Sequence, residues 1–294
     1  MITFISFCQR FSDRLPHKGA RPVSPCRHGL VALWIILSLL QQPIAHAGIS
    51  VIGGLVRTKT AQPGETFEGI ILVRNSGDGP AEGRVYQTDY LFTADGKDDY
   101  ALPGTTPRSN AKWFSLGASR VSIAAGETVS VSYKGKVPVS ADLKGTYWSM
   151  VMVEMAASIA PEEKADKDKV AFGLRTQMRY AVQIVVEIGE TGERALKVVD
   201  KKIVNDGGKR IFQMDVMNTG ERVVIPSGSL EMFDAKGVSI GKFESGKMRI
   251  YPACSVRHRV DLTGVPPGKY NALALLDNGD SYVIGAQYLL EIQK

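Results

Sequence analysis

The sequence predicts an all-β fold, with two immunoglobulin-like β-sandwich domains in tandem after a signal peptide. Three observations support this prediction. Residues 48–294 consist of short runs of alternating polar and apolar residues separated by turn sequences, with no long stretch of helical periodicity. Each half of this region holds about seven such runs, the strand number of an immunoglobulin-type sandwich. The two halves also repeat each other's turn and strand sequences.

The first 47 residues are predicted to be a cleaved signal peptide. Leu30–Leu40 is an apolar run of 11 residues that follows a basic segment, and it is shorter than the roughly 20 residues that span a bilayer. Ala45-His46-Ala47 behind it has the small-x-small pattern of a cleavage site. An uncleaved membrane anchor is the alternative. Cleavage after Ala47 predicts an exported protein that is not inserted in the membrane.

Removing the predicted leader changes the charge and the cysteine count. The leader holds five of the 36 basic and one of the 30 acidic residues, so 31 basic and 29 acidic residues remain. A net charge this small offers no footprint for nucleic acid, and we expect no nucleic-acid partner. Cys254 is the one cysteine left, so the sequence predicts no internal disulfide. The remaining 247 residues are enough to bury two cores without one.

The N-terminal domain is predicted to cover residues 48–192. Gly53-Gly54 in its first strand predicts a bulge or kink, and two segments, Thr93–Asn110 and Ala157–Lys169, are predicted to be polar loops. The predicted strands are Gly48–Val56, Phe67–Val73, Gly83–Phe92, Trp113–Leu116, Val121–Ile123, Val129–Val137, Gly145–Met155 and Val170–Ile188.

The C-terminal domain is predicted to cover residues 193–294 and repeats the first. Ile71–Asp78 (ILVRNSGD) is similar to Asp215–Glu221 (DVMNTGE), and Tyr147 and Tyr270 each follow Gly-x at a strand entry, where a tyrosine corner is expected. The predicted strands are Leu196–Val204, Ile211–Met217, Val223–Ile225, Ser229–Phe233, Val238–Phe243, Lys247–Ile250, Val256–Leu262, Lys269–Leu276 and Ser281–Glu291. A single larger sandwich is the structural alternative.

The strand Val170–Ile188 is unusual in its length. Nine of its ten even-numbered residues are apolar, whereas the odd-numbered ones are mostly small, polar or charged. Nineteen residues would extend roughly 60 Å, far beyond the common strand length of about 5–6 residues. The segment near Thr176–Ile184 is therefore predicted to be a sheet edge whose even-numbered side chains are not all buried by the same domain. A normal core strand is the alternative.

Enzymatic chemistry is not indicated by the residues after Ala47. Cys254 and His258 lie four apart in a strand pattern, about 13 Å along one face, which exceeds the roughly 3 Å reach of a nucleophile and its base. Two such residues also fall short of the four ligands of a structural zinc site. We therefore predict no catalytic residues, no metal and no cofactor, and we expect Arg257-His258-Arg259 to be a solvated strand face.

The layout resembles the periplasmic chaperones of the chaperone–usher pilus pathway. The resemblance rests on two predicted immunoglobulin-like domains after a leader, a charged loop before a long alternating strand, and the block RTQMRYAVQIVVEI at Arg175–Ile188. A basic residue in the first strand and the Asn-Ser-Gly turn after Phe67–Val73 add to it. In that family the long strand donates apolar side chains to an incomplete pilin subunit by β-strand addition.

The resemblance implies a set of partner-binding residues. In that family two basic residues also bind the subunit's terminal carboxylate, since charge-assisted hydrogen bonds favour such pairs. By position, Arg179 or Arg175 would be one of them and Lys59 or Arg57 the other. The side chains predicted to face a partner along the long strand are Met178, Tyr180, Val182 and Ile184.

The sequence thus predicts an exported, non-enzymatic, chaperone-like protein that binds pilus or other secreted subunits along residues 170–188. The predicted partner is a secreted or pilin-like subunit, with an outer-membrane usher as a second partner and a self-capping dimer as a state that covers the edge. The alternative is a passive interaction or structural protein of the cell envelope, in which residues 170–188 are fully covered by their own chain.

Overall fold

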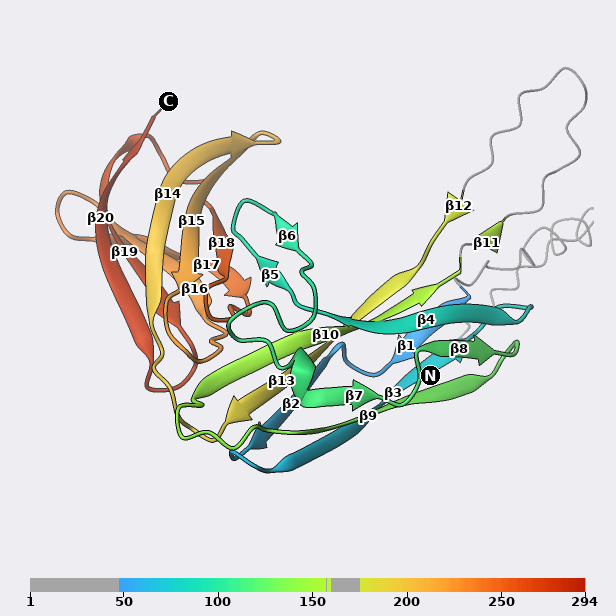
Figure 1. The fold of residues 1–294 in the computed structure, drawn as a ribbon. Coiled ribbons are helices and arrows are strands. Elements are labelled where there is room, and N and C mark those ends of the chain that lie inside the picture. The colour runs from blue at the N-terminus through green and yellow to red at the C-terminus, as the bar shows by residue number, and fades with distance from the viewer. Residues whose placement is uncertain (1–47, 157, 160–174, 294) are drawn as a thin grey trace, which may run out of the picture. The chain divides into compact units, whose positions relative to one another are not determined.

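The computed structural model describes residues 48–156, 158–159 and 175–293. Within these residues every regular element is a strand except the 3-10 helix η1, Ala111–Trp113 (Figure 1). The described residues belong to one unit, and the predicted signal peptide lies outside them. None of the helices in this described part is long and apolar enough to span a membrane.

Two sheets face each other in the N-terminal half. The four-stranded sheet has the order β1-β3-β9-β7 and is antiparallel, whereas the five-stranded sheet has the order β2-β13-β10-β4-β8, with β2 parallel to β13. The strands of the first sheet are β1 (Ile49–Ile52), β3 (Thr66–Asn75), β9 (Thr128–Lys136) and β7 (Phe114–Leu116). Those of the second are β2 (Val56–Ala61), β13 (Arg179–Ile188), β10 (Gly145–Met155), β4 (Ala81–Thr88) and β8 (Arg120–Ile123).

The core of this half lies between the two sheets because inward side chains alternate with outward ones along each strand. Ile71 and Val131 from the first sheet and Val151 and Val186 from the second are all 0% exposed and belong to one apolar cluster. Two short pairs add to these sheets: β5 (Leu91–Phe92) with β6 (Asp98–Asp99), and β11 (Ser158–Ile159) with β12 (Arg175–Thr176).

The C-terminal half is built from two further sheets, with the orders β14-β15-β18 and β17-β16-β19-β20. Its strands are β14 (Leu196–Asp206), β15 (Lys209–Asn218), β16 (Ser227–Phe233), β17 (Ser239–Lys247), β18 (Ser255–Asp261), β19 (Gly268–Asp277) and β20 (Val283–Ile292). Phe212, Leu230 and Met232 are at most 1% exposed in its core. The predicted all-β sandwich class is confirmed, while the domain boundary after residue 192 stays a prediction.

The repeated turn sequences fold alike. The buried Asn75 accepts a hydrogen bond from the Gly77 N–H and donates to the Gly79 and Ile123 carbonyls. Asn218 does the same, accepting from the Gly220 N–H and donating to the Arg222 and Ile250 carbonyls. A buried asparagine satisfies backbone groups that would otherwise lose hydrogen bonds, which explains why both halves carry it.

The predicted tyrosine corner is present in the C-terminal half, where the Tyr270 hydroxyl donates to the Pro266 carbonyl at 3.0 Å. Tyr147 behaves differently. Its ring lies 4.6 Å from the Trp113 ring and under the Arg108 guanidinium, so it is a packing residue.

The predicted first strand is two strands in two sheets. β1 pairs with β3, and β2 pairs with β13 after the chain has changed sheets through Gly53, whose φ of +85° favours glycine. The Gly53-Gly54 kink is therefore a crossing between sheets, because the chain must leave one sheet edge to reach the other.

Candidate functional site

Strand β13 has one half that is covered on both sides and one half that is not. It pairs with β10 from Arg179 to Ile188, but β2 begins to cover its other side only at Gln183, whose N–H donates to the Leu55 carbonyl at 2.8 Å. The Met155 N–H donates to Met178 O, which sets the even-numbered backbone groups of β13 toward β10. The odd-numbered groups of Arg179 and Ala181 therefore point to the side that β2 leaves open.

The burial of the even-numbered side chains of β13 changes at the same place along the strand. Tyr180 is half-buried, and its hydroxyl donates to the Ile49 carbonyl at 2.5 Å. Met178, just before the strand, is half-buried as well. Val182 and Ile184 are 0% and 1% exposed within the chain's own core. The prediction that these two face a partner is therefore wrong, because the opposite sheet already covers this end of the row.

The first part of the predicted long strand cannot be placed. Val170–Leu174 lies outside the described residues, and so does the side chain of Arg175, whose backbone forms β12 with Thr176. Arg175 as a partner-binding residue stays a prediction. In the described part, the regular structure is interrupted at Gln177 and Met178 between β12 and β13.

Arg179 already has an anionic partner within the chain. Its Nε lies 2.9 Å from Oε2 of Glu154, the residue opposite it on β10. Glu154 is 4% exposed and also accepts from Arg84, from the Tyr86 hydroxyl at 2.8 Å and from the Gln177 amide at 2.9 Å. The carboxylate thus joins β4, β10 and β13 on the outer face of the sheet.

The pKa of Glu154 reflects two opposing effects. Burial raises it, since desolvation disfavours the charged carboxylate. The hydrogen bonds from Tyr86 and Arg84 and the charges of Arg179 and Arg84 lower it by more, so that the net pKa lies below the ordinary value of 4.5. Glu154 is therefore ionised at neutral pH.

The predicted carboxylate clamp of Arg179 with Lys59 or Arg57 is overturned by strand register. Lys59 lies opposite Val186 and Arg57 opposite Ile184, so both share the inward face of the sheet. Arg179 is on the other face, and one carboxylate cannot reach both. Arg57 instead donates to the Gly54 and Ile52 carbonyls, and Lys59 lies 4.0 Å from Glu65.

The outward face of β13 is not uniformly polar. Val185 is fully buried, and Trp148, opposite it on β10, stacks on Tyr251 with ring centroids 4.7 Å apart. The Tyr251 hydroxyl donates to the Gln183 side chain. Val185 was the one apolar exception among the odd-numbered residues near this end of the strand, which is the signal that a second packing surface lies here.

A cationic pocket was missed by the sequence-based predictions. It has a volume of about 450 Å³, and its wall includes Arg222, Lys247 and Arg249 together with Glu187. Among the described residues these three cations have no carboxylate within 4.0 Å, and Arg222 donates to the Glu190 carbonyl instead. They are spread over 28 residues of sequence, so no local motif could have revealed them.

His258 and Cys254 are both buried, and the expectation of a solvated face at residues 257–259 is wrong for His258. Arg257 and Arg259 point outward to Asp215 and Asp206, while His258 alternates inward and its Nδ1 lies 2.7 Å from Ser245 Oγ. Burial raises the pKa of the Cys254 thiol to about 11. Across the described residues there is no group of three or more His, Cys, Asp or Glu that could hold a metal.

No protein-family model matches the chain, and no curated protein matches it. Solved structures do. The CsuC–CsuE chaperone–tip adhesion subunit complex of Acinetobacter baumannii is 13% identical, with a TM-score of 0.42, over 81% of this chain and 98% of that one. The class 5 fimbriae chaperone CfaA is 11% identical, with a TM-score of 0.41, over 84% and 100%.

A third similar structure is the Salmonella enterica SafA pilin in complex with the SafB chaperone, 12% identical with a TM-score of 0.35 over 82% of this chain and 96% of that one. The chain is thus similar to solved pilus chaperones along most of its length. At these identities and TM-scores the likeness carries no conclusion about function, which has to rest on the strands described above.

Proposed function

We propose that the protein is an exported, non-enzymatic, chaperone-like protein that binds a β-strand of a secreted subunit along the open half of β13. The observation that carries the proposal is that, within the part of the chain that the structure describes, no strand pairs with the outward backbone groups of Arg179 and Ala181, although the rest of β13 is enclosed by β2 and β10. An exposed edge is a template for strand addition, and proteins usually cover or blunt it. Here β2 stops short of covering it.

The partner is proposed as a secreted or pilin-like subunit, the class that the sequence resemblance implies. The open edge itself requires only a partner with a strand to add. Tyr180 and Met178 are the half-buried apolar side chains that such a strand would meet. Periplasmic location, an usher and a self-capping dimer belong to this proposal as predictions.

The exposed apolar residues near the edge support a protein partner. Leu55, whose carbonyl marks the end of β2 coverage, is 44% exposed, and Ile52 on β1 is 40% exposed. Burial of such surface stabilises a complex by about 25 cal/mol per Å². A strand added at Ala181 would continue the sheet beside these residues.

Proline at position 181 tests the proposal. The Ala181 N–H is not used in the β10 ladder, so Ala181→Pro should leave the fold intact but remove a donor from the open edge. Ala181→Val keeps the donor and is the matched control. We expect recovery of secreted subunits with the affinity-tagged protein from a periplasmic extract to fall with Ala181→Pro only.

Amide hydrogen exchange provides a second readout that needs no partner. The amides of Arg179 and Ala181 should exchange fast in the isolated protein, whereas the Val182 amide should be protected by β10. Uniform protection of all three has two explanations: coverage of the edge by its own chain, which would favour the passive envelope protein, or coverage by a second copy, which is the self-capping dimer of the proposal. Sedimentation at two concentrations separates those two explanations.

A further inference from the structure

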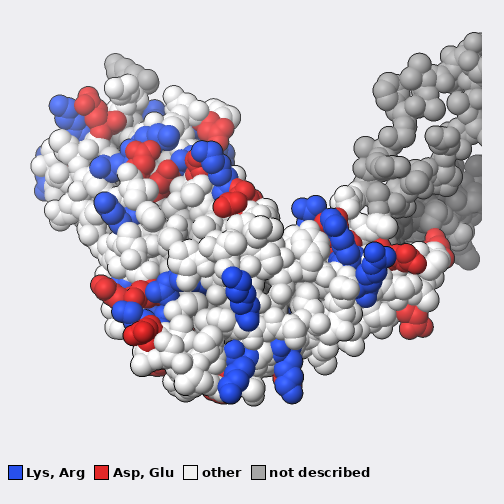
Figure 2. Space-filling view, viewed as in Figure 1, with Lys and Arg blue, Asp and Glu red and all other residues white. Residues whose placement is uncertain are grey.

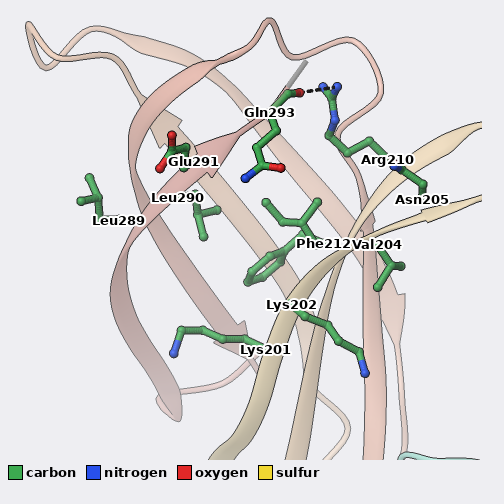
Figure 3. Close-up of a pocket in the computed structure, with 11 residues that line it drawn as sticks. Lys201, Lys202, Val204, Asn205, Arg210, Phe212, Leu289, Leu290, Glu291 and Gln293 are labelled. Atoms are coloured by element: carbon green, nitrogen blue, oxygen red, sulfur yellow. Dashed lines mark hydrogen bonds between the residues drawn. The ribbon is translucent and has the colours of Figure 1, made fainter.

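The C-terminal sandwich is open along one side. On the closed side β17 meets β18, where Ser245 and His258 are hydrogen-bonded. On the other side the end strands β14 and β20 do not pair, and a cavity of about 450 Å³ lies between them. Its lining includes Ile203, Phe212 and Leu290, so that its floor is apolar (Figure 3). We call this cavity the β14–β20 groove.

The free backbone groups of β14 can be identified from the ladder. The Leu262 N–H donates to Arg210 O, which directs the even-numbered groups of β15 toward β18 and the odd-numbered ones toward β14. Ile211 and Gln213 face Val204 and Lys202, so these β14 residues are bonded. The edge groups with no strand partner among the described residues belong to Lys201, Ile203 and Asn205.

Two cations lie at the ends of the groove, and Figure 3 shows Phe212 and Leu290 between them. The Lys201 Nζ reaches from β14 to within 4.5 Å of the Tyr288 ring centre on β20. Arg210 donates to the Val265 carbonyl at 2.9 Å and to the Gln293 carbonyl at 3.1 Å. Both cations are held by neutral groups, with no carboxylate partner in the described part of the chain.

The lining as a whole is positive. The lining contains three basic residues and one acidic residue, which give it a net charge of +2; they are Lys201, Lys202, Arg210 and Glu291. Lys202 is 3.9 Å from Asp200, outside the lining, and is the less available cation. An apolar floor between two unneutralised cations is complementary to an extended segment with one apolar and two acidic side chains.

The register sets the spacing of those side chains. Arg210 lies opposite Asn205 on β14, four residues from Lys201, which is roughly 13 Å along the strand. Side chains on one face of an added strand recur every second residue. The acidic residues should therefore be at positions i and i+4, with the apolar residue at i+2 over Phe212 and Ile203.

We propose that the β14–β20 groove binds an extended acidic segment of a partner protein, of the form acid-x-apolar-x-acid, which adds to the edge of β14. This surface belongs entirely to the C-terminal half and is independent of the open half of β13. Backbone hydrogen bonds to Lys201, Ile203 and Asn205 give the affinity, and the two cations set the register.

Binding of a fluorescein-labelled peptide, Thr-Asp-Thr-Val-Thr-Asp-Thr, to the full chain tests the proposal by anisotropy. Lys201→Gln should weaken binding about fivefold, the effect of one exposed ion pair. Ile203→Pro should abolish it, since it removes a free edge donor that the β15 ladder does not use, while Ile203→Val should leave it unchanged. A peptide with lysines in place of the aspartates should not bind.

Three results would overturn the proposal. They are the absence of peptide binding at millimolar concentration, equal binding by the Ile203→Pro protein, and equal binding of peptides whose acids are at i and i+3. Self-association of the Lys201→Gln protein without any peptide binding by the unaltered chain would assign Lys201 to edge protection instead. Unfolding curves of each variant show whether the sandwich itself has been kept.

Discussion

Glu154 is a single carboxylate that holds three strands together at the polar end of the second sheet. Replacing it with glutamine should destabilise the protein by about 2 kcal/mol, since Arg84 and Arg179 would lose their charged partner and Tyr86 a strong acceptor. Urea unfolding at pH 7 measures this. Arg179→Gln is the matched change on an exposed partner and should cost less, about 1 kcal/mol; equal losses would contradict the central role of Glu154.

The same carboxylate has a pH signature. Because its folded pKa is below the ordinary value of 4.5, its contribution is complete above that pH and is lost as the pH falls through the folded pKa. When the pH is lowered below 4.5, the free energy of unfolding should therefore decrease less in the Glu154→Gln protein than in the unaltered protein.

His258 should make stability depend on pH in a higher range. Burial lowers its pKa to about 4 from 6.5, so between these values the unfolded chain binds a proton that the folded chain does not. Protonation of the unfolded chain at His258 therefore costs no stability above pH 6.5. The free energy of unfolding should fall by up to roughly 3 kcal/mol as the pH drops toward 4. Unfolding midpoints measured over this pH range should vary less with pH in the His258→Gln protein than in the unaltered protein. An equal dependence on pH would contradict this explanation.

Individual residues also show what the sequence could predict. Alternation separated the two faces of β13, with Arg179 and Val182 on opposite sides, but it did not show that the Val182 side is covered by the chain's own core. It could not show that Lys59 and Arg57 share the inward face, because that depends on the register of the parallel β2–β13 pair, which no local pattern encodes. His258 was placed on the wrong face for a different reason: residues 257–259 were predicted to share one solvated face, although alternation along a strand directs His258 away from the side of Arg257 and Arg259.

At the scale of elements, the loop that follows β4 is organised by one buried acid. Asp89 is 0% exposed and accepts from the backbone N–H groups of Gly104, Thr105 and Thr106 and from the Ser109 hydroxyl. Burial raises the pKa of Asp89, but these hydrogen bonds lower it by more. The polar segment predicted as a loop is thus held in place by contacts that its composition does not reveal.

Removing that acid should release the loop. Asp89→Ala is expected to cost about 3 kcal/mol, because several buried donors lose their acceptor together. The amides of Gly104, Thr105 and Thr106 should then exchange at least as fast as those of exposed turns, as measured by hydrogen exchange. Asp95→Ala in the nearby exposed turn is the matched control and should leave the three amides unchanged.

The long strand shows the limits of periodicity at this scale. The pattern predicted an extended segment with its even-numbered residues on one apolar face, and Val182, Ile184, Val186 and Ile188 do share one face, which lies in the core. It overestimated the number of side chains left for a partner, since the opposite sheet covers Val182 and Ile184. How far that sheet extends is set by β3 and β9, which are distant in sequence from β13.

At the scale of the whole molecule, Trp148 connects the clusters of the two halves. It is 3% exposed, stacks on Tyr251 and donates from its indole to the Tyr90 carbonyl at 2.9 Å. Trp148→Ala should cost about 3–5 kcal/mol and make unfolding of the two halves non-coincident. Calorimetry should resolve two transitions in the variant, whereas we expect a single transition in the unaltered protein. A single transition at an unchanged temperature would contradict this role.

The fold class and the internal repeat could be predicted because both depend on local sequence. Alternation of polar and apolar residues indicated the fold class, and the similar turns at Asn75 and Asn218 indicated the repeat. The expectation that the protein has no nucleic-acid partner stays a prediction. On the face seen in Figure 2, acidic and basic side chains are interspersed over the C-terminal strands. The β14–β20 groove and the pocket around Arg222 could not be predicted, because each collects residues from segments that only the three-dimensional structure brings together.

The crossing at Gly53 has a consequence for partner selection. The residue at which the chain changes sheets fixes how many backbone groups of β13 stay vacant, and therefore how many hydrogen bonds a visiting strand can form there. Lengthening or shortening the connection by two residues would alter that number without changing β13 itself. Under the proposed function, the point at which the chain leaves β1 therefore sets the length of the segment that can add to β13.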